Sequence, residues 1–245
     1  MICPKCGFDN VHKDYECRRC GIIFEKYHHH QLQRAQNIDE EGSETTGIID
    51  ILFHTKENMN PIIWIGQWVL LVFLVFLGVR YMSFSIESNR IADSFFHLVN
   101  LPFHEAGHIF FRPLGRVFTS LGGSLAQLLM PLICMVFLVF KTKDPFGGAM
   151  TFWWFGENFL DMAPYINDAK SLSLPLLGGN FGYSSPYGFH DWEFILKELG
   201  LIEFDTLFAR ISFFTGCTIM IISYTWAFVL LVRQQKTLLK TKERP

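Results

Sequence analysis

The chain has 245 residues, of which 50 % are hydrophobic and 26 are phenylalanine, and its formal net charge at pH 7 is −2. This composition excludes an ordinary soluble enzyme, and the nearly neutral charge gives no reason to expect a nucleic-acid partner. The first long apolar run begins only after residue 60, so we expect no secretory signal peptide.

Two CxxC pairs, each followed by a glycine, lie at the start of the chain. Their cysteines are Cys3, Cys6, Cys17 and Cys20. Two such pairs can close a tetrahedral Zn²⁺ site, and the lack of a secretory signal argues against two disulfides. Residues 1–26 resemble the zinc ribbons found as accessory modules, so we expect one structural Zn²⁺ that stabilises this small unit. We expect the ribbon to be cytoplasmic, where it can recruit a cytosolic partner.

The polar residues 27–60 predict a flexible linker. Beyond it lie three uncharged apolar runs that are long enough to cross a bilayer, at 62–79, 117–140 and 211–232. Two further runs, 91–111 and 146–166, carry acids or histidines, as segments around a buried site would.

The fold class that we expect is an all-α polytopic membrane protein with about five membrane helices, preceded by a small zinc-ribbon domain. The membrane domain is expected to cover residues 61–235, and a basic tail residues 236–245. The bilayer and a membrane-protein or peptide substrate are then the expected partners.

Residues 104–108, within the run 91–111, have the sequence His-Glu-Ala-Gly-His. Histidines four residues apart lie on one face of a helix, so the imidazoles of His104 and His108 can bind one Zn²⁺. Glu105 can then take a proton from a zinc-bound water and generate a hydroxide nucleophile near neutral pH. Ionisable groups at membrane depth are costly unless they serve a site, so we predict a functional metal site rather than a chance match.

The residues around this motif also suit a buried site. His97 and Asn100 extend the polar face of the predicted helix toward its N-terminus. Pro102 is expected to kink the helix or to start it. Ala106 and Gly107 are small, which predicts that another backbone approaches closely beside the metal.

A catalytic zinc normally takes a third protein ligand and keeps one position open for water. Over about residues 90–172 the sequence resembles the site-2 protease family of intramembrane zinc metalloproteases. In that family a segment with Asn and Pro that ends in Asp-Gly supplies the third ligand, which implies Asp168 here, with alanine after it in place of glycine. Residues 122–131 are similar to the family's small-residue segment, with Gln127 where an Asn is expected.

Two other residues compete with Asp168 for the role of third ligand. Asp161 lies in the same segment and is either a membrane-buried acid paired with a neighbour or the ligand itself. His190 follows a glycine-rich loop, so it folds over the site, donates the ligand or is an ordinary loop residue near the membrane surface. Glu157 and Asn158 are expected to orient the ligands or the substrate.

The charges at the two ends of the chain conflict with five full crossings. The C-terminal tail is basic, so the positive-inside rule predicts that it is cytoplasmic, as is expected for the ribbon. Five crossings would place the two ends on opposite sides. Either one segment is re-entrant, with the first half of 117–140 and the polar segment 146–166 the ones to suspect, or the loop 171–189 dips into the membrane, or the charge rule fails here.

These features favour an intramembrane zinc metalloendopeptidase that hydrolyses peptide bonds of membrane proteins with a metal-activated water. One alternative is a non-catalytic membrane metal-binding scaffold that recruits a partner through its ribbon. A fourth protein ligand at the metal would favour that alternative. Another alternative is a metal transporter, which needs a polar path through the helices.

Overall fold

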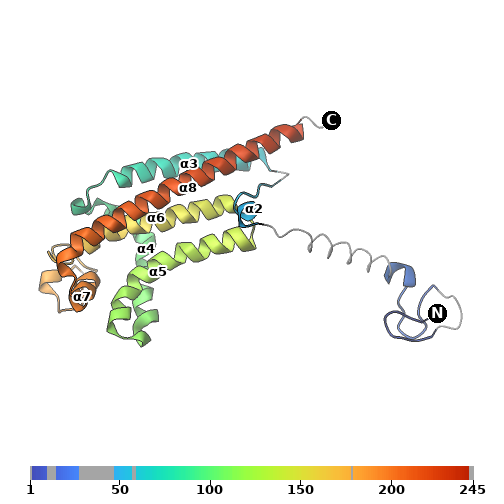
Figure 1. Ribbon diagram of the computed structural model, residues 1–245, viewed down its shortest axis with the longest axis horizontal. Helices are drawn as coiled ribbons and strands as arrows, with labels where there is room; N and C mark the ends of the chain where they lie inside the picture. The colour runs from blue at the N-terminus through green and yellow to red at the C-terminus, as the bar shows by residue number, and fades with distance from the viewer. Residues whose placement is uncertain (1, 10–14, 28–46, 57–58, 178, 243–245) are drawn as a thin grey trace. The chain divides into compact units, whose positions relative to one another are not determined.

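A computed structural model describes residues 2–9, 15–27, 47–56, 59–177 and 179–242 (Figure 1). The chain forms two compact units, Met1–Ile49 and Asp50–Pro245. The boundary between them falls inside the predicted linker. The last residues of that linker pack on the helical unit, because the backbone oxygen of Leu52 accepts a hydrogen bond of 2.8 Å from Nε1 of Trp226.

The first unit is built from two similar turns, one for each CxxC pair. In each turn the N–H of the first cysteine donates to a backbone oxygen five residues on, from Cys3 to Phe8 and from Cys17 to Ile22. Gly7 and Gly21 have φ values of 71° and 69°, a conformation that glycine adopts without a steric penalty. The repeated turns thus follow directly from the repeated CxxCG sequence.

The second unit is helical throughout its regular structure. Its helices are α2 (Ile48–Leu52), α3 (Pro61–Met82), α4 (Phe95–Phe111), α5 (Arg116–Val136), α6 (Pro145–Asn167), α7 (Asp191–Glu198) and α8 (Asp205–Lys242). A π-helical turn, Phe137–Lys141, extends α5. The described residues form no β-strand and only three isolated bridges. The predicted all-α class is therefore confirmed, and a helix covers each of the five predicted runs.

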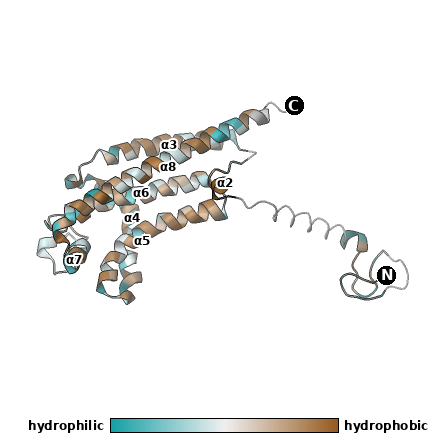
Figure 2. Cartoon of the chain, viewed as in Figure 1, coloured by the Kyte–Doolittle hydropathy of each residue, from teal (hydrophilic) through white to brown (hydrophobic). Residues whose placement is uncertain are grey.

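Three segments in the described part of the chain are long and apolar enough to cross a membrane: Pro61–Met82, Arg116–Lys141 and Ile202–Leu239. Figure 2 shows α3 and α5 as largely hydrophobic. The helix α4 has only 17 residues, and α6 is not among the three because its polar residues lower its hydropathy. Membrane association thus rests on three of the five predicted spans.

The core of the second unit lies where α6 packs along α8, and α3 contacts both of these helices (Figure 1). Trp153, Leu160 and Met220 are almost completely buried there. Gly156 and Gly216 face each other, and a side chain on either one would collide with the opposite helix. Because α6 is buried on most of its length, its polar residues face protein.

The helices α4 and α5 form a second close pair. Gly107 and Gly122 meet at their contact, and a Cβ atom on Gly107 would overlap the backbone oxygen of Gly122. The predicted close approach beside the histidine motif is therefore confirmed. Pro102 lies inside α4, which begins seven residues earlier, where the side chain of Ser94 accepts a hydrogen bond of 3.0 Å from the N–H of His97.

Candidate metal sites

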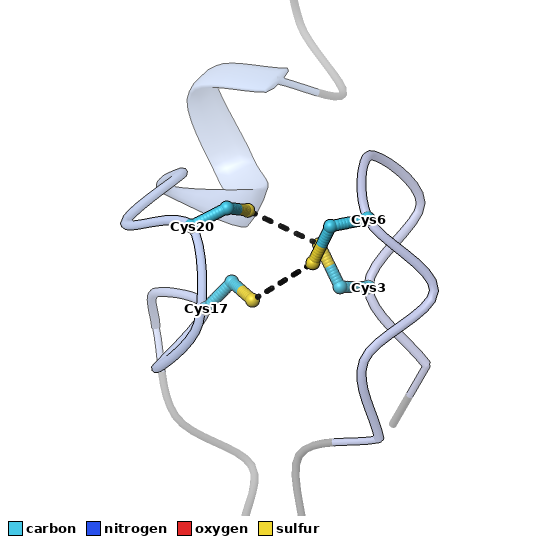
Figure 3. Close-up of side chains that lie close together, drawn as sticks. All are labelled: Cys3, Cys6, Cys17 and Cys20. Atoms are coloured by element: carbon cyan, nitrogen blue, oxygen red, sulfur yellow. Dashed lines mark hydrogen bonds between the residues drawn. The ribbon is translucent and has the colours of Figure 1, made fainter.

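The four cysteine sulfurs of the first unit converge on one point (Figure 3). The Sγ atoms of Cys3 and Cys20 are 3.7 Å apart, as are those of Cys6 and Cys17. A tetrahedral ion with bonds of about 2.3 Å to sulfur requires sulfur atoms about 3.8 Å apart, whereas a disulfide requires about 2.05 Å. The cluster therefore matches a four-thiolate metal site, as the sequence predicts.

A second group of metal-binding side chains lies in the helical unit. It contains His104, His108 and Asp191, and one ligand atom from each lies within 4.8 Å of the others. The Oδ2 atom of Asp191 is 3.2 Å from Nε2 of His104 and 3.3 Å from Nε2 of His108. A tetrahedral Zn²⁺ with bonds of about 2.0–2.1 Å to nitrogen and oxygen spaces its ligand atoms at about 3.3–3.4 Å. The two distances from Asp191 to the histidines therefore match those between ligands of such an ion.

The hydrogen bonds on the far side of each imidazole determine which nitrogen faces the site. Nδ1 of His104 is 3.1 Å from Oε1 of Gln127, and Nδ1 of His108 is 2.7 Å from the backbone oxygen of Thr119. Both partners are oxygens that can only accept, so each Nδ1 carries the proton. In a neutral imidazole the Nε2 lone pair then points toward Asp191. Two lone pairs and a carboxylate oxygen converge, and a cation must neutralise them, either a proton on each ring or a metal ion.

The amide of Gln127 is itself held in this orientation. Its Nε2 donates a hydrogen bond of 3.0 Å to Oδ2 of Asp161, which leaves Oε1 toward His104. The same Asp161 carboxylate accepts from Asn100 at 3.0 Å and lies 2.8 Å from Nδ1 of His97. Asp161 is therefore a buried acid with several partners that supports the site through Gln127.

Asp191 is positioned by the start of α7. His190 caps this helix, because its Nδ1 accepts from the N–H of Glu193 at 3.2 Å. The hydroxyl of Tyr165 accepts from the N–H of Asp191 at 3.0 Å and lies 3.4 Å from its Oδ2. Burial alone would raise the pKa of Asp191, but hydrogen bonds from His104 and His108, which form when Nε2 of each ring is also protonated, outweigh it and lower the pKa below its ordinary value. Asp191 is thus the ionised carboxylate that a metal ligand requires.

Asp168, the third ligand that the family resemblance implies, does not belong to this group. Its carboxylate accepts hydrogen bonds from Ser173 at 2.8 Å and from the N–H of Leu174 at 2.9 Å. Its Oδ2 also lies 3.5 Å from Nε2 of His190. Asp168 therefore fixes the loop after α6 and the residue that caps α7, while Asp191 is the carboxylate that lies beside the two histidines.

The other predicted residues lie behind or beside the group. Glu157 is fully buried and accepts from Asn100 at 3.0 Å, so it joins the network of Asp161. Asn158 donates to the backbone oxygen of Trp154 at 2.9 Å. Glu105 is exposed and, within the described residues, makes no hydrogen bond or ion pair. Its carboxylate is therefore free to act on a water molecule near His104.

Sequence reasoning missed Asp191 and Tyr165 as parts of the site, and it named Gln127 only as a member of the family-like segment 122–131. The segment was noticed through His190, but the neighbouring aspartate was passed over. An acid at the first position of a short amphipathic helix was the available signal.

Comparisons with protein-family models, with curated proteins and with solved structures found no match to this chain.

The assignment of Asp191 predicts the metal content of two variants. Wild-type protein, purified in detergent and saturated with zinc, should contain two ions per chain by elemental mass spectrometry. Asp191→Ala should contain one, because a ligand is lost. Asp168→Ala should still contain two at saturating zinc, although with weaker binding, because Asp168 supports the loop that carries Asp191 without being a ligand itself. A loss in Asp168→Ala with full content in Asp191→Ala would show that the resemblance gives the right ligand.

The orientation of His104 by Gln127 predicts a weaker metal site when the amide is removed. Gln127→Leu should lower zinc affinity at this site by about 10–100-fold, the usual cost of losing a hydrogen bond to a ligating histidine. Competition with a chelator measures the change. Ser124→Ala is the matched control, since Ser124 is buried on the same helix and its hydroxyl has no partner. Equal affinities in the two variants would refute the positioning role.

Proposed function

We propose that this protein is a membrane zinc metallopeptidase that hydrolyses peptide bonds of membrane-protein substrates. The observation that carries the proposal is the convergence of two histidine Nε2 atoms and the Asp191 carboxylate at the spacing of a tetrahedral ion, beside the unpaired Glu105. The resemblance of residues 104–108 to site-2 proteases agrees with this reaction class. The cysteine cluster of the first unit is proposed to hold a second, structural Zn²⁺.

The roles of the residues follow from their positions. His104, His108 and Asp191 would hold Zn²⁺, which when bound acidifies a water and polarises the scissile carbonyl. Glu105 accepts the proton of that water as general base and then delivers it to the leaving amine as general acid. Gln127 and the backbone oxygen of Thr119 keep the two imidazoles in the required tautomer.

An open coordination position distinguishes a catalytic metal from a structural one. Within the described residues the group contains three ligands and no fourth His, Cys, Asp or Glu. The nearby Tyr165 hydroxyl is engaged with Asp191. This arrangement leaves one tetrahedral position for water and favours a peptidase over a scaffold, whose metal would be closed by protein ligands.

The site lies near one end of a candidate membrane span. Arg116 and Lys141 enclose a stretch without charges, and Thr119, whose backbone oxygen contacts His108, is only three residues inside it. Three residues of helix rise about 4.5 Å. The proposed metal is therefore within one helical turn of the membrane surface, where water and an unwound end of a substrate helix are both available.

We also propose that α6 crosses the membrane as a fourth span. It has 23 residues, and its polar side chains are buried against protein rather than facing lipid. With α3, α5 and α8 this gives four crossings, which place the ends of the helical unit on the same side. The basic tail and the ribbon can then both be cytoplasmic, as their charges and thiols predict.

Glu105→Gln tests the function. The variant should keep two zinc ions per chain, because Glu105 is not a ligand, and should lose cleavage of membrane proteins by at least about 100-fold, because the general base is gone. Purified protein is reconstituted with a labelled membrane-protein fraction, and new N-termini are identified by mass spectrometry. Glu87→Gln, at another exposed acid, is the control. Cleavage by Glu105→Gln at the wild-type rate would contradict the proposal.

A further inference from the structure

A groove with two arginines in its lining lies beside the metal group, on the side of the first turns of α5. It encloses about 370 Å³ and is lined by Arg112, Arg116, Thr119, Gly188 and Phe194, among others. Two of these residues link it to the metal ligands: the backbone oxygen of Thr119 contacts His108, and Gly188 is three residues before Asp191. The groove is adjacent to the proposed active site and is not part of it.

The charge of this groove is entirely positive. Arg112 and Arg116 both line it, and no carboxylate does. Neither arginine forms a salt bridge with a described residue. The guanidinium of Arg116 is held 4.8 Å from the ring centroid of Phe194, so it is positioned rather than freely rotating. Two unpaired guanidinium groups at one groove suit an oxyanion with several acceptor oxygens.

The start of α5 adds backbone donors to the same groove. The cap residue is Gly115, which has no side chain to accept from the first N–H groups of the helix. The positive end of the helix dipole is therefore at the part of the groove that Gly115 and Arg116 line. A phosphate placed there accepts from the backbone and from the arginines together.

The surroundings of the groove place it at the membrane surface. Arg116 is the last charge before the apolar stretch of α5. Side chains of Phe110, Leu114 and Phe118 next to it are 78 %, 61 % and 48 % exposed. Aromatic and aliphatic side chains around a pair of arginines are typical of the zone where lipid headgroups meet acyl chains.

We propose that this groove binds the phosphate of a phospholipid headgroup. Its volume accommodates a headgroup but not two acyl chains, which would lie against the exposed apolar side chains of α4 and α5. Those side chains favour a lipid over free phosphate, since only a lipid covers them. The bound lipid would anchor the α4–α5 turn, and with it the backbone oxygen that orients His108.

The test uses the full-length protein in detergent and measures binding by native mass spectrometry. The probes are dioctanoyl-phosphatidylglycerol, dioctanoylglycerol without a phosphate, and inorganic phosphate. Phosphatidylglycerol should bind at one saturable site and at least about tenfold more tightly than either other probe. The variant with Arg112→Gln and Arg116→Gln should lose this binding by about tenfold or more. Arg210→Gln, at an exposed arginine of α8, should bind as wild type does.

Three results would overturn the proposal: unchanged lipid binding in the double variant, equal binding of dioctanoylglycerol, or equal binding of inorganic phosphate. Retained metal content in the double variant shows that it is folded. The measurement requires neither metal nor activity, so His104→Ala should bind the lipid as wild type does. Failure of the lipid site and failure of the proposed peptidase are thereby distinguished.

Discussion

The arrangement of the helical unit depends on the close approach of two imidazole nitrogens to one carboxylate oxygen. The Nδ1 protons of His104 and His108 are committed to oxygen acceptors, so when the rings are neutral their remaining lone pairs both point at the carboxylate of Asp191. Without a cation this arrangement is repulsive, and four helices would have to hold it against that repulsion. With a metal ion the same contacts become ligand bonds, and each hydrogen bond behind the imidazoles increases their basicity. The surrounding packing follows from this requirement.

Small residues make that packing feasible. Because Gly107 and Gly122 bring the backbones of α4 and α5 into contact, the backbone oxygen of Thr119 can reach His108. A Cβ atom on Gly123 would lie only 2.5 Å from Nε2 of His104, so the ring occupies the space that a side chain would fill. Asn100 donates hydrogen bonds to the buried carboxylates of Glu157 and Asp161, and Gln127 donates one to Asp161. The polar residues that lower the hydropathy of α6 thus include Asp161, which holds the Gln127 side chain that orients His104.

Local sequence patterns predicted the local features well. The spacing of the four cysteines and the two histidines is sufficient to place each set around a point, because a turn or a helix fixes the geometry over a few residues. The acid that joins the two histidines was not predictable in this way. Asp191 is separated from His104 by 87 residues and reaches it only through the loop that Asp168 and His190 secure. A resemblance in sequence assigned the role to Asp168, whose backbone neighbours instead satisfy its carboxylate. The number of crossings was likewise beyond local reasoning, since the polar residues that α6 buries against protein lower its hydropathy whether or not it crosses the membrane.

Zinc K-edge X-ray absorption is the most direct test of the metal group in the helical unit. The sample is full-length protein in which all four ribbon cysteines are changed to serine, so that sulfur ligation is removed. We predict one bound zinc with two imidazole nitrogens and oxygen ligands at about 2.0–2.2 Å and no sulfur, and loss of that signal in Asp191→Ala. Zinc that is absent, or that binds with fewer than two imidazoles, would contradict the account.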